Sequence, residues 1–110
     1  MHGNVFYPFR DNTVEWQLKD GDTPLPDHTA ITREVLLLEK SGATVTIDSD
    51  SETTFFTEQA DRIEMKAFNL SAGKKTELVA GNYTARLVVY DVSNPNGLVW
   101  IDGRSIKVIV

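Results

Sequence analysis

The sequence predicts an all-β domain built from two packed antiparallel sheets. Apolar and polar residues alternate with a period of two along most of the chain, which is typical of strands with one buried and one wet face. Turn-forming residues separate these stretches about every 8–15 residues, as in small sandwiches. No stretch of about ten residues keeps a helical period. Together these features predict an immunoglobulin-like sandwich of about seven short strands.

Most of the strands are predicted from this alternation and from β-branched residues. The run of three leucines at 36–38 blurs the alternation within residues 31–40. A short helix is an alternative there, but the flanking turns favour a strand that is buried on both faces. The expected strands span residues 14–19, 31–40, 44–47, 53–57, 62–67 and 82–91, followed by one return strand at 98–110 that is interrupted at 102–104.

The strand at 82–91 is the best defined. Tyr83 opens it directly after a tight turn, which fits a tyrosine corner, whose hydroxyl bonds to the backbone across the turn. The alternative is that Tyr83 is simply an aromatic residue of the core whose hydroxyl is exposed to solvent. Asn96 and Gly97 predict the following hairpin turn because both residues tolerate positive φ. Gly103 predicts a bulge or bend in the return strand.

Length and composition fit one domain spanning residues 1–110. Residues 1–10 form an aromatic-rich lead-in arm that either caps one end of the sandwich or docks on a neighbour. Lysine and arginine number 11 against 16 acidic residues, which gives a net charge of −5. An acidic chain repels phosphate backbones, so nucleic acid is not an expected partner. No signal peptide or membrane span is predicted, and a soluble protein made inside a cell is expected.

The sequence contains no recognisable catalytic set, cofactor-binding motif or metal site, so no enzyme is predicted. Cysteine is absent, which excludes thiolate chemistry and disulfides. His28 lies in a proline-rich turn and is expected to be an exposed loop histidine without a nucleophile elbow nearby. Asp48, Asp50 and Glu52 alternate and are expected to form a solvated acidic turn. The alternative, a calcium site, lacks the other ligands that the ion needs.

Aromatic residues are the remaining candidates for a binding site, because protein-binding hot spots are enriched in them. Phe55, Phe56 and Trp100 could bind a partner; the alternative is that two of these three residues lie in the core. Trp16 is expected to be a core residue. The candidate interaction surface is formed by Phe6, Tyr7, Phe9, Phe55, Phe56 and Trp100.

Two parts of the chain resemble a known family. Residues 14–25 (VEWQLKDGDTPL) combine a polar strand with a proline turn. Residues 78–91 (LVAGNYTARLVVYD) and 94–100 (NPNGLVW) form a Gly-x-Tyr-x-Ala strand with a closing hairpin. The pattern resembles phage tail and baseplate domains, in particular the N-terminal domain of the phage baseplate upper protein. Those proteins continue into further domains, so the resemblance implies a small accessory, adaptor or decoration protein.

The expected function is therefore that of a non-enzymatic structural or adaptor protein of a bacteriophage particle, in its tail, baseplate or head. Other virion or host proteins are the expected partners, together with further copies of the chain that pair along the apolar end at Ile109 and Val110. The host cytoplasm during assembly, and then the virion, is the expected location. The alternative function is an immunoglobulin-like module of a bacterial protein that binds carbohydrate or another ligand. That module would carry coplanar exposed aromatic rings, Trp100 among them.

Overall fold

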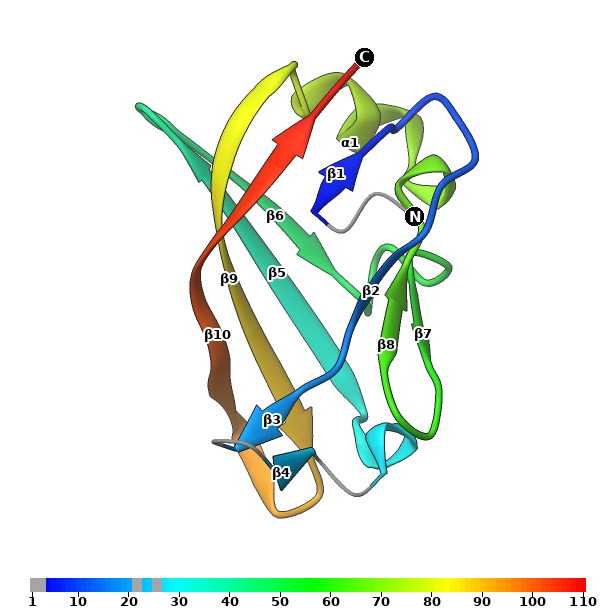
Figure 1. Cartoon of the computed structure of the whole chain (residues 1–110), viewed down its shortest axis with the longest axis vertical. Coiled ribbons are helices and arrows are strands. Elements are labelled where there is room, and N and C mark those ends of the chain that lie inside the picture. The colour runs from blue at the N-terminus through cyan, green and yellow to red at the C-terminus, as the bar shows by residue number, and fades with distance from the viewer. Residues whose placement is uncertain (1–3, 21–22, 25–26) are drawn as a thin grey trace.

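The computed structural model describes residues 4–20, 23–24 and 27–110, which form two facing sheets and a small separate hairpin (Figure 1). The larger sheet has the order β1-β10-β9-β5-β6, and the smaller one has the order β2-β8-β7. Their strands are β1 (Val5–Phe6), β10 (Asn94–Val108), β9 (Gly81–Asp91), β5 (Arg33–Lys40), β6 (Ala43–Asp48), β2 (Val14–Trp16), β8 (Ile63–Met65) and β7 (Phe56–Glu58). The predicted all-β, two-sheet sandwich is confirmed.

The remaining elements are short. Strands β3 (Lys19–Asp20) and β4 (Thr23–Pro24) pair with each other beside the β9–β10 end of the larger sheet (Figure 1). Two 3₁₀ turns, η1 (His28–Ala30) and η2 (Ala67–Asn69), lie between strands. Helix α1 (Ala72–Glu77) begins where the sequence predicts only a break in the strand pattern. Its N-cap is Ser71, whose hydroxyl accepts a hydrogen bond from the Lys74 amide.

A single hydrophobic core fills the space between the two sheets, and both sheets contribute their inward faces to it. On β9 the buried residues are Tyr83, Ala85, Leu87 and Val89, which are the residues that the alternation places on one face. Trp16 is also buried, as expected. Residues 33–40 form a strand rather than a helix, and β7 begins at Phe56, later than the predicted strand at 53–57.

The predicted turn at Asn96 and Gly97 is wrong. Asn94 pairs with Asp91, so the chain reverses through Val92 and Ser93. Gly97 instead lies inside β10, at a register shift against β9 and with φ of +84°. The positive φ that suits Asn-Gly in a hairpin turn serves a bulge here. The bulge predicted at Gly103 is confirmed, because the register shifts between Asp102 and Arg104.

The end of β10 is not a free edge, which corrects the expectation that Ile109 and Val110 pair along one. Strand β1 lies parallel to β10 on its outer side, with Phe6 beside Val108. The Ile109 amide also donates a hydrogen bond to the Phe6 carbonyl at 3.0 Å. The described residues include no helix that is long and apolar enough to cross a membrane.

Candidate functional site

The described part of the lead-in arm, residues 4–10, packs against one end of the sandwich, and residues 1–3 lie outside the described residues. Phe6 is fully buried, and its ring meets that of Phe55 edge to face, with centroids 5.7 Å apart. Asn12 bridges the arm by donating to the Val5 carbonyl at 2.8 Å and accepting from the Tyr7 amide at 3.2 Å. These contacts fix the direction in which the chain leaves the core toward Phe9.

Phe9 projects from this arm into solvent, with 57% of its surface exposed. The Lys75 ammonium lies 5.8 Å from the centre of the Phe9 ring and 4.2 Å from that of Phe68. Phe68 is itself 45% exposed. A cation between two aromatic faces is attracted to both rings. Lys75 therefore joins the arm, η2 and α1 into one surface, which we call the Phe9–Phe68 surface.

A hollow of about 340 Å³ also borders Phe9. It is lined by Tyr7, Phe9, Arg10, Ile109 and Val110. Figure 1 shows β1, α1 and the end of β10 at the same end of the molecule. This end combines exposed apolar side chains with the cationic groups of Arg10 and Lys75. Such a surface can hold apolar anchors of a partner and the acidic groups beside them.

The other predicted interaction residues are distributed differently. Phe55 and Phe56 lie in the core with their rings edge to face, 4.7 Å between centroids, so neither can contact a partner. Phe6 is removed from the candidate surface for the same reason. All three rings belong to the core between the two sheets, to which large aromatic side chains contribute much buried area.

Trp100 is partly buried at a register shift of β10. With Lys19, Leu98 and Val99 it lines a hollow of about 310 Å³. Its indole nitrogen is buried and has no hydrogen-bond partner among the residues that the structure describes. Trp100 lies in the first half of β10, whereas the hollow beside Phe9 is lined by Ile109 and Val110, which follow β10, so Trp100 is not part of the Phe9–Phe68 surface.

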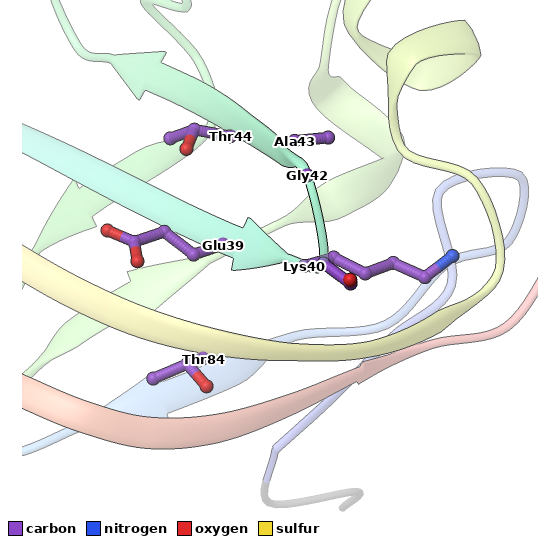
Figure 2. Close-up of a pocket in the computed structure, with 7 residues that line it drawn as sticks. Glu39, Lys40, Gly42, Ala43, Thr44 and Thr84 are labelled. Atoms are coloured by element: carbon purple, nitrogen blue, oxygen red, sulfur yellow. The ribbon is translucent and has the colours of Figure 1, made fainter.

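A third hollow, of about 500 Å³, lies at the turn between β5 and β6 (Figure 2). Glu39, Thr44 and Thr84 project on the same side from three neighbouring strands, whereas Lys40 reaches the other way (Figure 2). The side chains of Glu39, Thr44 and Thr84 are exposed. The Lys40 ammonium donates to the Ala80 carbonyl at 3.3 Å. This hollow offers hydroxyl groups and one carboxylate, with no buried group to hold a ligand.

The prediction of an exposed His28 is wrong, because the side chain is fully buried. Its Nε2 accepts a hydrogen bond from the Leu18 amide at 2.9 Å, and Nδ1 lies 3.4 Å from the Ala60 carbonyl oxygen. An acceptor at Nε2 and a carbonyl facing Nδ1 describe a neutral imidazole protonated at Nδ1. His28 ties three chain segments together and is not available as a base.

The acidic turn at 48–52 is held by groups of the protein itself. The Arg33 guanidinium bonds both oxygens of Asp48 and lies 3.2 Å from an oxygen of Asp50. Hydrogen bonding to Arg33 lowers the pKa of Asp48. Glu52 is buried, which corrects the expectation of a solvated turn at this residue, and it accepts a hydrogen bond from the Ser71 amide at 2.7 Å. Within the described ranges, no group of three potential metal-ligating side chains is found.

Sequence reasoning did not predict the burial of Glu34. It is fully buried on β5, and neither carboxylate oxygen has a hydrogen-bond partner in the described part of the chain. Burial, followed by the nearby carboxylate of Glu58, raises the pKa of Glu34 to about 8. The available signal was its position inside a strand that was predicted to be buried on both faces.

Comparison with known proteins adds no relatives. No protein-family model matches the chain, and neither a curated protein nor a solved structure matches it.

Proposed function

We propose that this chain is an immunoglobulin-like, non-enzymatic domain that acts through protein–protein contacts, as a structural or adaptor subunit of a bacteriophage particle. Its partners are other virion or host proteins and further copies of the chain. It is present in the host cytoplasm during assembly and then in the virion. The phage assignment rests on the sequence resemblance of residues 14–25 and 78–100.

The strand order supports the immunoglobulin-like part of the proposal. In variable-type immunoglobulin domains, strands G, F, C and C′ lie side by side and face a sheet that contains B, E and D. The order β10-β9-β5-β6 and the order β2-β8-β7 correspond to these two arrangements. The hydrogen bond from the Tyr83 hydroxyl to the Val79 carbonyl, 2.7 Å long, is the bond of a tyrosine corner.

The Phe9–Phe68 surface is the observation that carries the proposal of protein contacts. Aromatic rings and arginine are enriched in protein interfaces. The contacts of Asn12 and the burial of Phe6 hold the arm in place before a partner binds. An ordered surface loses little conformational entropy on association. An apolar partner segment flanked by acidic residues complements Arg10 and Lys75.

The alternative, a carbohydrate-binding module, has less support. It requires several exposed aromatic rings near Trp100, but Phe55 and Phe56 lie in the core. It also often uses calcium near Asp48 and Asp50, and Arg33 occupies both carboxylates. Glycan-array binding that Trp100→Ala abolishes would favour this alternative over protein contacts.

Site-specific crosslinking tests the proposed protein contacts. Phe68 is replaced with a photo-crosslinking phenylalanine analogue. The experiment is done in cells that also express the genes next to the gene of this protein. The matched control carries the analogue at Val92, which is 89% exposed in the turn between β9 and β10. We expect crosslinks to one or a few defined proteins from position 68 and not from position 92. Equal crosslinking from both positions, or none from position 68, contradicts the proposal.

A further inference from the structure

The outer edge of β6 is an exposed strand edge with open hydrogen-bonding groups. Strand β6 is the last strand of the larger sheet and, among the described strands, pairs with β5 alone; α1 lies close to β6 but makes no backbone hydrogen bond with it. Apart from that pairing, no hydrogen bond involves the backbone of residues 43–47 in the described structure. Ala43, Thr44 and Thr46 are exposed. A strand edge of this kind is a template for another strand.

One hydrogen bond shows which backbone groups of β6 point outward. The Ser49 amide donates to the Glu34 carbonyl at 2.9 Å, in continuation of the β5–β6 register. Alternate residues of an antiparallel strand bond to the same neighbour. The odd-numbered residues of β6 therefore face β5, and Thr44 and Thr46 direct their N–H and C=O groups to the open edge.

The edge of β6 lacks the features that usually protect strand edges. Charged side chains, proline and bulges discourage pairing with other chains. Residues 43–47 contain no charged residue or proline, and their register against β5 is continuous. The opposite edge of the same sheet differs, because β10 carries three register shifts and its end is covered by β1. The irregular and partly covered edge at β10 is protected against pairing with another chain, whereas the edge at β6 is not.

We propose that β6 pairs antiparallel with β6 of a second copy of this chain, related by a two-fold axis at Val45. Thr44 of one copy then lies opposite Thr46 of the second copy, and the reverse. Each of these two pairs exchanges two backbone hydrogen bonds, so that every open group of Thr44 and Thr46 is used. The threonine side chains meet on the outer face, a favourable cross-strand pair.

The charges favour a second copy in this orientation. A parallel pair would bring together the two acidic turns that follow β6, with Asp48 and Asp50 of both copies adjacent. The antiparallel pair separates these turns and places each one near the β5–β6 turn of the other copy, where Glu39 and Lys40 balance each other in charge. Closed two-fold dimers use the same patch on both subunits, as this arrangement does.

The pair buries two short edges, and its area lies below the roughly 1,200–2,000 Å² of stable protein interfaces. The dimer is therefore weak and depends on concentration, and it becomes important where many copies gather, as in a particle. The β6 dimer involves neither the Phe9–Phe68 surface nor the protein that binds there. The proposed dimer and the proposed contacts of that surface therefore succeed or fail separately.

Sedimentation equilibrium from about 10 μM to about 1 mM tests the proposal. We expect a monomer–dimer equilibrium for the unmodified chain. Thr46→Pro removes an outward N–H without breaking the β5 ladder and is expected to give monomers. A monomer for the unmodified chain throughout this range overturns the proposal, and so does a dimer that Thr46→Pro leaves intact.

Two double variants test the register. T44K/T46K places lysine opposite lysine and is expected to abolish the dimer, whereas T44K/T46E places lysine opposite glutamate and is expected to restore it. Thermal unfolding checks that each variant folds. Concentration-dependent protection of the Thr44 and Thr46 amides from hydrogen exchange locates the contact at this edge. Dimerisation without this protection, or equal dimerisation of both double variants, contradicts the proposed pairing.

Discussion

The Tyr83 hydroxyl donates a hydrogen bond to the carbonyl oxygen of Val79 at 2.7 Å, across the turn that connects α1 with β9. The Tyr83 ring is buried in the core, so this bond anchors the turn to the central strand of the larger sheet. It decides between the two alternatives left open by the sequence, because the tip of the side chain is bonded to the backbone.

Tyr83→Phe removes this hydrogen bond and keeps the ring. We expect the free energy of unfolding to fall by about 1 kcal/mol, since the Val79 carbonyl loses a partner. Urea unfolding monitored by circular dichroism measures the change. Tyr90→Phe is the matched control, because no hydrogen bond of its hydroxyl is found in the described structure and its ring keeps the contact with Arg33. Equal effects of the two substitutions would show that the bond contributes nothing specific.

Gly97→Ala is expected to destabilise the fold strongly. Gly97 has φ of +84°, and a Cβ atom there would lie 2.7 Å from Val88 Cγ1 and 2.8 Å from the Tyr90 ring. Gly103→Ala is the control, because φ is +89° but no atom lies within 4 Å of its Cβ position. We expect Gly103→Ala to cost about 1–2 kcal/mol from backbone strain alone. The clash at Gly97 adds about 1–3 kcal/mol, and thermal unfolding of both variants checks the difference.

Glu34 makes stability depend on pH in a direction opposite to the usual carboxylate. Its pKa is about 8 in the folded chain and near the ordinary value of 4.5 in the unfolded chain. Between these values the unfolded chain has lost this proton and the folded chain has kept it. Stability from this group therefore falls as pH rises from 4.5 to 8 and is constant above 8.

Glu34→Gln is uncharged at every pH and removes this dependence. We expect the variant to gain stability relative to the unmodified chain as pH rises, on the order of 4 kcal/mol near pH 8. Chemical unfolding across pH 5–8, with the exposed Glu39→Gln as control, measures the difference. A difference between Glu34→Gln and the unmodified chain that stays constant across this range contradicts the assigned burial.

His28 is expected to be a neutral imidazole with its proton on Nδ1. The Leu18 amide donates to Nε2, and a proton on that nitrogen would place two donors against each other. Nitrogen-15 chemical shifts of the two ring nitrogens distinguish the tautomers. His28→Leu leaves the buried Leu18 amide without an acceptor and is expected to cost about 1–3 kcal/mol. A ring protonated on Nε2 in the folded chain is the result that excludes this geometry.

The sequence was a reliable guide where one strand face is buried against the core. The alternation of Tyr83, Ala85, Leu87 and Val89 with more polar residues predicts which face is buried, because successive side chains of a strand point to opposite faces. Features that depend on contacts between distant segments were beyond it. The burial of His28 depends on Leu18 and Ala60, and the role of Gly97 depends on its register against β9.

The candidate surface shows the same division. Phe9 was predicted as an interaction residue from its place in an aromatic-rich arm, and it is exposed. Phe68 and Lys75 were not singled out, because they belong to short helical segments that the alternation does not predict. Their proximity to Phe9 arises from the packing of the arm and α1 at one end of the sandwich (Figure 1).

Density-gradient sedimentation of phage particles tests the central claim most directly. The tagged chain and its F9S/F68S variant are expressed during particle production, with Val92→Ser as the exposed control. We predict that the unmodified chain and Val92→Ser sediment with particles, and that F9S/F68S stays in the soluble fraction although it folds. Absence of the unmodified chain from particles, or retention of F9S/F68S in them, would contradict the account.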